Sequence, residues 1–213
     1  LNCISIGYGM LALRKVMEGL GLLQNLQGLP GDDRLWAIMP IVIITVAYTA
    51  VAGLWGVVVT DLLQYVLAMV GALLVMFYAL HEVGGLGALV EGLHAAGKGA
   101  HLQLVPRGED ALLPLTTLLG YLGIQWWAFR NSDGGGMFVQ RLSATANEQE
   151  AERATHAFNI LNYVVRTWPW ILVGLATLVL YPGLGPEEKR LGYVLAMRDH
   201  LPTGMRGALV ASF

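Results

Sequence analysis

The sequence predicts an all-α membrane protein, and three observations lead to that class. Of the 213 residues, 55% are hydrophobic and only 13% are charged, whereas an average soluble domain is about 25% charged. The mean hydropathy is +0.57. Four stretches lack Asp, Glu, Lys and Arg for about 20 residues each, which as a helix crosses a bilayer core about 30 Å thick. They are Leu35–Thr60, Leu62–Leu80, Ala111–Phe129 and Thr167–Pro186.

From these stretches we expect residues 1–213 to form a single transmembrane helical region. The expected spans are 1–14, 35–59, 61–80, 112–140 and 157–181, with the start of a further span at 205–213. Asp61 alone separates the second span from the third, which implies a very short connection there. Because the chain starts at Leu1 and ends at Phe213 inside an apolar run, we expect it to be the central fragment of a longer protein.

Polar segments separate the expected spans. Residues 14–34 and 182–204 are expected to be loops, and residues 81–110 a long Gly-rich loop. The charged connector at 141–156 contains Asn147–Arg153, which predicts a short solvated helix. No separate soluble domain is indicated.

Composition and motifs exclude several classes of function. The net charge of −2 does not suggest a nucleic-acid partner. Cys3 is the single cysteine, so an internal disulfide and a Cys-rich metal site are excluded. The loop histidines His81, His94 and His101 have separations that match no helical ligand pair. Without a phosphate-binding loop, a nucleophile elbow or a dinucleotide-binding glycine pattern, the sequence does not predict an enzyme.

The first costly polar group is Asp61, which follows Thr60 and precedes Gln64 by about one helical turn. A charge in the bilayer core costs about 2.5–3.5 kcal/mol on insertion scales and usually faces a cavity or a partner. We therefore consider these three residues as part of an ion pathway. The alternative is a helix cap at the membrane interface, where a carboxylate gains from the helix dipole.

The second polar place is a triple glycine, Gly134–Gly136, close to the end of an apolar stretch. Glycine is a poor helix former, and yet apolar residues resume directly after it, which is typical of a discontinuous membrane helix that frees backbone groups to bind ions or substrate. We expect a break near residues 130–136. The alternative is an interfacial aromatic pair followed by a loop. The candidate substrate-binding residues here are Trp126, Trp127, Arg130, Asn131 and Asp133.

The third polar place is a stripe formed by Asn159, Asn162 and Arg166 in an otherwise apolar span. Spacings of three and four place these residues on one face of a helix. Pro169 is expected to kink that helix. Asn162 and Arg166 are candidate substrate-binding residues, and the alternative is a structural polar seam between helices.

Residues Tyr48–Gln64 contain a tyrosine, a Gly-Leu pair and a Thr-Asp-x-x-Gln run, and Gly134–Arg141 contains a Gln-Arg motif. These motifs resemble those of the sodium:solute symporter family, which includes sodium/glucose cotransporters. Arg166–Val173 and Tyr193–Arg198 resemble family segments further along. The match covers nearly the whole chain.

This resemblance implies a fragment of a leucine-transporter-like bundle built from two inverted five-helix repeats, of which the chain would hold core helices three to seven. It implies a sodium site outside this fragment and no other metal within it. Asp61 matches an aspartate on the sodium exit route. Core helices six and seven would bring Trp126–Asp133 and Asn162–Arg166 to the substrate.

The expected function is secondary active transport, in which sodium influx drives uptake of a small polar organic solute by alternating access. Sugar is the first expectation, whereas Arg130 and Arg166 keep an organic anion open because two arginines could pair with a carboxylate. A transporter-like membrane sensor is the other alternative. We expect sodium as the coupling ion, no cofactor, the lipid bilayer as surroundings, no obligate protein partner, and a multi-pass location in the cell membrane, as in a bacterial inner membrane.

Overall fold

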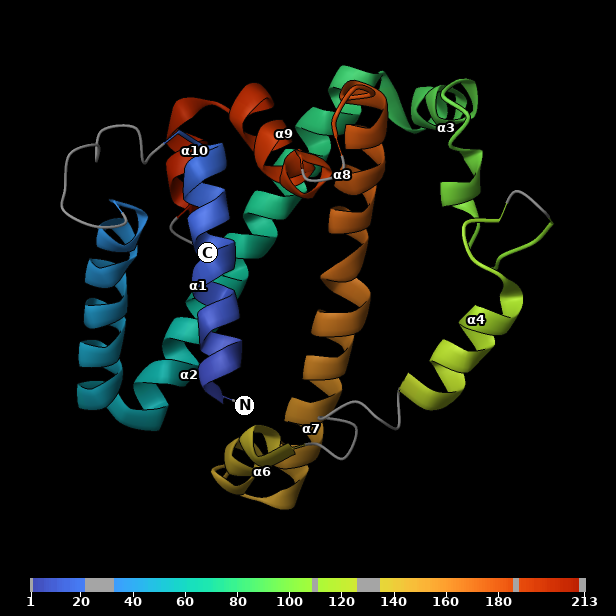
Figure 1. Ribbon diagram of the computed structural model, residues 1–213. Helices are drawn as coiled ribbons and strands as arrows, with labels where there is room; N and C mark the ends of the chain where they lie inside the picture. Colours follow the sequence, from blue (N-terminus) through green and yellow to red (C-terminus); the bar gives the residue numbers. More distant parts are fainter. Residues whose placement is uncertain (1, 22–32, 109–110, 126–134, 186–187, 211–213) are drawn as a thin grey trace. The chain divides into compact units, whose positions relative to one another are not determined.

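The computed structural model describes residues 2–21, 33–108, 111–125, 135–185 and 188–210, and these residues form helices and connecting turns without a strand (Figure 1). The chain divides into two compact units. The first comprises Leu1–Val83 with Leu172–Phe213, and the second comprises Gly84–Ile171. The all-helical class expected from the sequence is therefore confirmed for the described part of the chain, whereas the inverted repeat stays a prediction.

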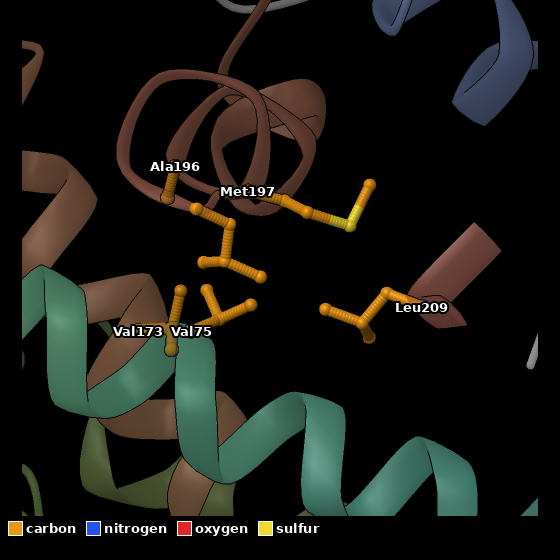
Figure 2. Packing of buried hydrophobic residues seen from close by; sticks show 6 residues of the cluster. Val75, Val173, Ala196, Met197 and Leu209 are labelled. Carbon is orange, nitrogen blue, oxygen red and sulfur yellow. The ribbon is translucent and has the colours of Figure 1, made fainter. Parts of the chain in front are cut away.

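The first unit surrounds a small apolar core (Figure 2). Its described helices are α1 (Asn2–Gly19), α2 (Asp33–Val83), the C-terminal part of α8 (Thr167–Leu180), the 3-10 turn η5 (Glu188–Leu191), α9 (Gly192–His200) and α10 (Thr203–Val210). Buried apolar side chains from α2, α8, α9 and α10, and from the residue that directly follows α9, meet at this core. They are Val75, Val173, Ala196, Met197, Leu201 and Leu209.

Two glycines bring α9 close to its neighbours. A Cβ atom on Gly19 of α1 would lie 2.8 Å from Cγ1 of Val194, and a Cβ atom on Gly192 would lie 3.0 Å from Oγ1 of Thr177 in α8. Small residues at such contacts let helix backbones approach closely. These glycines therefore allow α9 to pack directly against α1 and α8.

Helix α2 is broken at Gly53, where φ is 62° and ψ is −158°. Only glycine adopts this region readily, and Figure 1 shows the helix bending sharply within α2. The connection expected at Asp61 is therefore wrong: Asp61 lies about two turns inside the helix that follows Gly53. The two helical segments are residues 33–52 and 54–83, in place of the expected spans 35–59 and 61–80. The bend lies at Gly53 because glycine can adopt a positive φ. An exposed carboxylate such as that of Asp61 can be part of a regular helix, so it does not by itself indicate a turn.

Both α2 and the helix from α7 to α8 are long and apolar enough to cross a bilayer. The candidate spans are Ile38–Val83 and Glu148–Leu180, and no residue in the most apolar stretch of the first is buried inside the protein. Val51 is 91% exposed and Trp55 is 79% exposed. Such large apolar side chains outside the protein core are expected where lipid is the solvent.

The second unit contains shorter helices before its long helix. The described elements are α3 (Gly85–Ala95), the 3-10 turn η2 (Gly99–Leu102), α4 (Leu115–Gly120), the π-helical turn η3 (Tyr121–Gln125), α6 (Gly135–Ser143), α7 (Glu148–Asn159) and the π-helical segment η4 (Ile160–Val165), followed by the start of α8. The short solvated helix expected at 147–153 is confirmed as the start of α7. Asn147 caps it, because its side chain accepts a hydrogen bond of 2.9 Å from the Glu150 N–H.

Two expected loops contain helices. Residues 81–110 include α3, in which Leu89 and Leu93 are buried four residues apart on one face. Residues 182–204 include η5 and α9. The expectation of plain loops was wrong in these two segments. Their glycines and polar residues obscured a short helical spacing of apolar residues, and the helices bury these apolar side chains against protein.

Candidate functional site

The helix between α7 and α8 widens into a π-helical segment over Ile160–Val165, which ends one turn before Pro169. The kink expected at Pro169 stays a prediction. The Arg166 N–H donates to the Leu161 carbonyl at 3.0 Å, a bond that spans five residues instead of four. Proline has no N–H to donate and its ring crowds the preceding turn. A π-helical widening next to such a residue is frequent at functional sites, and here it is flanked by the polar stripe.

Asn162 and Arg166 lie together, as their spacing of four predicts. The guanidinium Nη1 of Arg166 donates to Oδ1 of Asn162 at 3.2 Å. Thr167 follows, and its hydroxyl donates to the Tyr163 carbonyl at 3.1 Å and to the Asn162 carbonyl at 3.4 Å. These hydrogen bonds satisfy polar groups inside an apolar helix, so the stripe is held in one arrangement.

The same residues line an open depression of about 570 Å³. Asn162 is half-buried, whereas the Arg166 and Tyr163 side chains are exposed. The lining residues all belong to the second unit and are Asn162, Tyr163, Arg166, Thr167, Trp170 and Ile171.

The depression offers several kinds of contact to a solute. The amide of Asn162 and the hydroxyl of Thr167 can hydrogen-bond hydroxyl groups, and the guanidinium of Arg166 can bind a carboxylate in two places. Trp170 offers a large flat ring, whereas its indole nitrogen is buried. This combination suits a small polar organic molecule and provides no nucleophile–base pair.

Four residues that line the depression were not predicted as site residues: Tyr163, Thr167, Trp170 and Ile171. Tyr163 and Thr167 are spaced by four and lie beside the stripe on the same helix, so helical spacing could have identified them. Asn159, by contrast, is the last residue of α7 and does not line the depression.

The other candidate substrate residues, Trp126, Trp127, Arg130, Asn131 and Asp133, lie outside the described residues. Most of the break expected near 130–136 lies there as well. Gly135 and Gly136 are described, and they begin α6.

The candidate ion-pathway residues lie on the second segment of α2. The Thr60 hydroxyl donates to the carbonyls of Gly56 at 2.9 Å and Val57 at 3.0 Å, within its own helix. Asp61 and Gln64 are exposed. Because Asp61 is not at a helix N-terminus, the helix-dipole explanation for this carboxylate does not apply. A carboxylate on the side of an apolar helix costs more free energy in a membrane than a carboxylate that caps a helix N-terminus.

The comparison with protein families confirms the resemblance seen in the motifs. The sequence model described as "Sodium:solute symporter family" matches residues 12–185. That range includes the stripe at Asn162 and Arg166 and the residues around Asp61.

Individual relatives are cotransporters of animals. The chain is 29% identical over 205 residues to sodium/myo-inositol cotransporter 2 of Bos taurus, covering 82% of this chain and 30% of that protein. It is 43% identical over 61 residues to sodium/glucose cotransporter 1 of Oryctolagus cuniculus, covering 29% of this chain and 9% of that protein. It is 26% identical over 216 residues to sodium/glucose cotransporter 4 of Danio rerio, covering 85% of this chain and 31% of that protein. No solved structure matches the chain. The chain thus spans 30% of the length of the Bos taurus relative.

Proposed function

Because the chain belongs to the sodium:solute symporter family, we propose that the protein couples sodium influx to the uptake of a small polar organic solute by alternating access. The observation that carries this proposal is the hydrogen-bonded pair of Asn162 and Arg166 beside a π-helical widening in a long apolar helix. Polar groups inside such helices usually mark substrate or ion pathways. Transport needs no covalent chemistry, because a solute that binds one conformation better shifts the population toward it.

We assign solute contacts to Asn162 and Arg166 from the depression that they line. Trp126, Trp127, Arg130, Asn131 and Asp133 complete the proposed set from the sequence. A sugar or a similar hydroxyl-rich solute is the first candidate, because the amide and hydroxyl groups of the depression suit it and because relatives carry the names sodium/myo-inositol and sodium/glucose cotransporter.

An organic anion is the second candidate, and Arg166 favours it. In the described part of the chain the recorded side-chain partner of this guanidinium is the neutral amide of Asn162. A cation that is paired with a neutral group retains its charge for a carboxylate. Arg130 would supply a second cation.

We further propose that sodium leaves past Thr60, Asp61 and Gln64, with Asp61 as the charged group of the pathway. The proposed setting is a multi-pass protein of the cell membrane with the inverted-repeat bundle of a leucine-transporter-like fold. The relatives named above come from animals, so the comparisons lend no support to a bacterial inner membrane.

The test is solute uptake into proteoliposomes that contain the complete natural protein, with a sodium gradient or with choline in its place. Uptake should require the sodium gradient, and sodium-independent uptake would refute the coupling. Solute-dependent thermal stabilisation without any uptake would support a membrane sensor instead.

Two variants then test the site. Asn162→Ala should raise KM for the solute about fivefold, because one hydrogen bond contributes about 1 kcal/mol. Asn159→Ala is the matched control on the same helix, outside the depression, and should change KM less than twofold.

Arg166→Gln separates the solute classes. The loss of a bond to a charged group, about 1.5–3 kcal/mol, should raise KM tenfold or more for an anion. For a sugar, KM should rise no more than it does with Asn162→Ala. Equal effects of Asn159→Ala and Asn162→Ala would refute the assigned site.

A further inference from the structure

A polar cluster joins the ends of three helices in the first unit. Glu82 lies at the end of α2, Tyr181 directly after α8, and Arg198, Asp199 and His200 at the end of α9. Tyr181 contacts Asp199 and His200, which lie 18 and 19 positions further along the sequence. His200 also contacts Glu82, which joins α9 to α2. We call these five residues the end cluster. It shares no residue with the depression and is not used by the proposed function.

His200 is at the centre of the end cluster. Its Nε2 lies 3.3 Å from the Tyr181 hydroxyl, and that hydroxyl donates to Oδ2 of Asp199 at 2.9 Å. On the other side of the ring, Nδ1 lies 4.0 Å from Oε2 of Glu82. The His200 side chain is only 19% exposed. One imidazole therefore faces a carboxylate directly through one nitrogen and a second carboxylate through a tyrosine hydroxyl.

The pKa values of two groups beside His200, the Asp199 carboxyl and the Tyr181 hydroxyl, are shifted away from neutral pH. Arg198 Nε lies 2.8 Å from Oδ1 of Asp199, and this hydrogen bond lowers the pKa of the Asp199 carboxyl. The pKa of the Tyr181 hydroxyl is raised, first by its partial burial and then by its hydrogen bond to Asp199, so the hydroxyl remains a donor. Histidine, in contrast, is the residue type that gains or loses a proton between pH 5 and 8.

We propose that His200 makes the attachment of α9 to the ends of α2 and α8 dependent on pH. Protonated His200 donates from both nitrogens, to Tyr181 and toward Glu82, and its positive charge lies beside two carboxylates. The neutral His200 ring carries one N–H, so it can donate either to Tyr181 or toward Glu82 but not to both. Protonation thus strengthens the attachment as the pH falls, and deprotonation weakens it as the pH rises.

Other elements that pack against α9 carry charged groups as well. On α1, Arg14 Nε pairs with Oε1 of Glu18 at 3.0 Å. Near η5, a Glu188 carboxylate oxygen accepts a hydrogen bond from the Gly185 N–H at 3.1 Å. Lys15 of α1 and Lys189 of η5 are further charged groups on these elements. Among the described residues, the ion-pair contact given for His200 is the one with Glu82. Because the apolar core holds α9 as well, the pH effect modulates its attachment without releasing the helix completely.

The experiment measures how often α9 separates from its neighbours in the membrane-embedded complete protein. Ala196 of α9 is fully buried, so the variant Ala196→Cys reacts with a water-soluble thiol reagent only when α9 moves away. All other cysteines, including Cys3, are replaced. The reaction rate is measured at pH 5.5 and pH 8, and at each pH it is divided by the rate of the same protein carrying His200→Gln, which cancels the pH dependence of the thiol itself.

We expect the protein with His200 to react about two- to fivefold more slowly than His200→Gln at pH 5.5, the size of effect that a partly exposed ion pair produces, and equally fast at pH 8. His200→Arg, which is always charged, should react slowly at both pH values. Glu82→Gln should reduce the protection at pH 5.5.

The control is His81→Gln, which removes an exposed histidine that neighbours Glu82 but whose ring lies beside Phe77. It should leave the difference between pH 5.5 and pH 8 unchanged. The proposal is overturned if the rate ratio to His200→Gln is the same at both pH values, or if His81→Gln abolishes the pH effect as well.

Discussion

The core around α9 and the helical segment from Ile160 to Ile171 are both rich in apolar residues but place them in different surroundings. Around α9, the side chains of Val75, Val173 and Met197 are fully buried against other helices. Along the other region, Tyr163 is 67% exposed and Ile171 is 55% exposed, and polar groups interrupt the apolar surface. The difference teaches that composition identifies helices suited to lipid but does not distinguish residues that stabilise the fold from residues available to a ligand. Three substitutions sharpen that distinction.

The largest expected effect is at the core. Met197→Ala should lower the free energy of unfolding by about 2–5 kcal/mol, because it removes a fully buried side chain and leaves a cavity. Leu63→Ala is the control: Leu63 is also a large apolar residue, but it is 59% exposed on α2, so the change should cost less than about 0.5 kcal/mol. Thermal unfolding of the purified protein measures both. A cost for Leu63→Ala equal to that of Met197→Ala would mean that the two regions do not differ as described.

The second effect is at the bend in α2. Gly53→Ala should destabilise by about 1–3 kcal/mol, because an L-residue is strained at φ 62° and ψ −158°, although no atom lies within 4 Å of the added methyl group. Gly174→Ala in α8 is the control, since it also meets open space but has no positive φ. It should be neutral or stabilising by up to about 1 kcal/mol. If Gly53→Ala and Gly174→Ala change the free energy of unfolding in the same direction, the backbone at Gly53 is not strained for an L-residue.

The smallest effect is at the end cluster and depends on pH. The Arg198 hydrogen bond lowers the folded-state pKa of Asp199, so its stabilising contribution is present above the ordinary aspartate pKa of about 3.9 and is lost as pH falls through the folded-state value. Because both groups are partly exposed, we expect a contribution below about 1 kcal/mol.

Arg198→Gln should therefore reduce stability near neutral pH slightly and move the midpoint of acid unfolding to higher pH. Lys189→Gln, which removes an exposed cation of η5, should leave that midpoint in place. Acid titration followed by circular dichroism checks both. An unchanged midpoint in Arg198→Gln would show that the pair does not stabilise the folded state.

The contact between Asn162 and Arg166 was within reach of sequence reasoning, because it is local. Asn162 and Arg166 meet as their spacing of four predicts, and the resemblance to the symporter family followed from motifs around Asp61 and Gly134. The position of Asp61 was not within reach. Its charge indicated a chain turn, whereas the backbone turns at Gly53, and sequence spacing alone does not show which glycine adopts a positive φ.

Charge content and the long uncharged stretches determined by themselves that this chain is helical, because a bilayer requires every backbone polar group to be satisfied within the helix. Family membership likewise follows from the sequence. Two features emerged with the folded structure alone: residues 192–200 form a helix packed on α2 and α8, and Glu82, Tyr181 and His200 meet. Those contacts join distant parts of the chain through side-chain packing, which local periodicity does not encode.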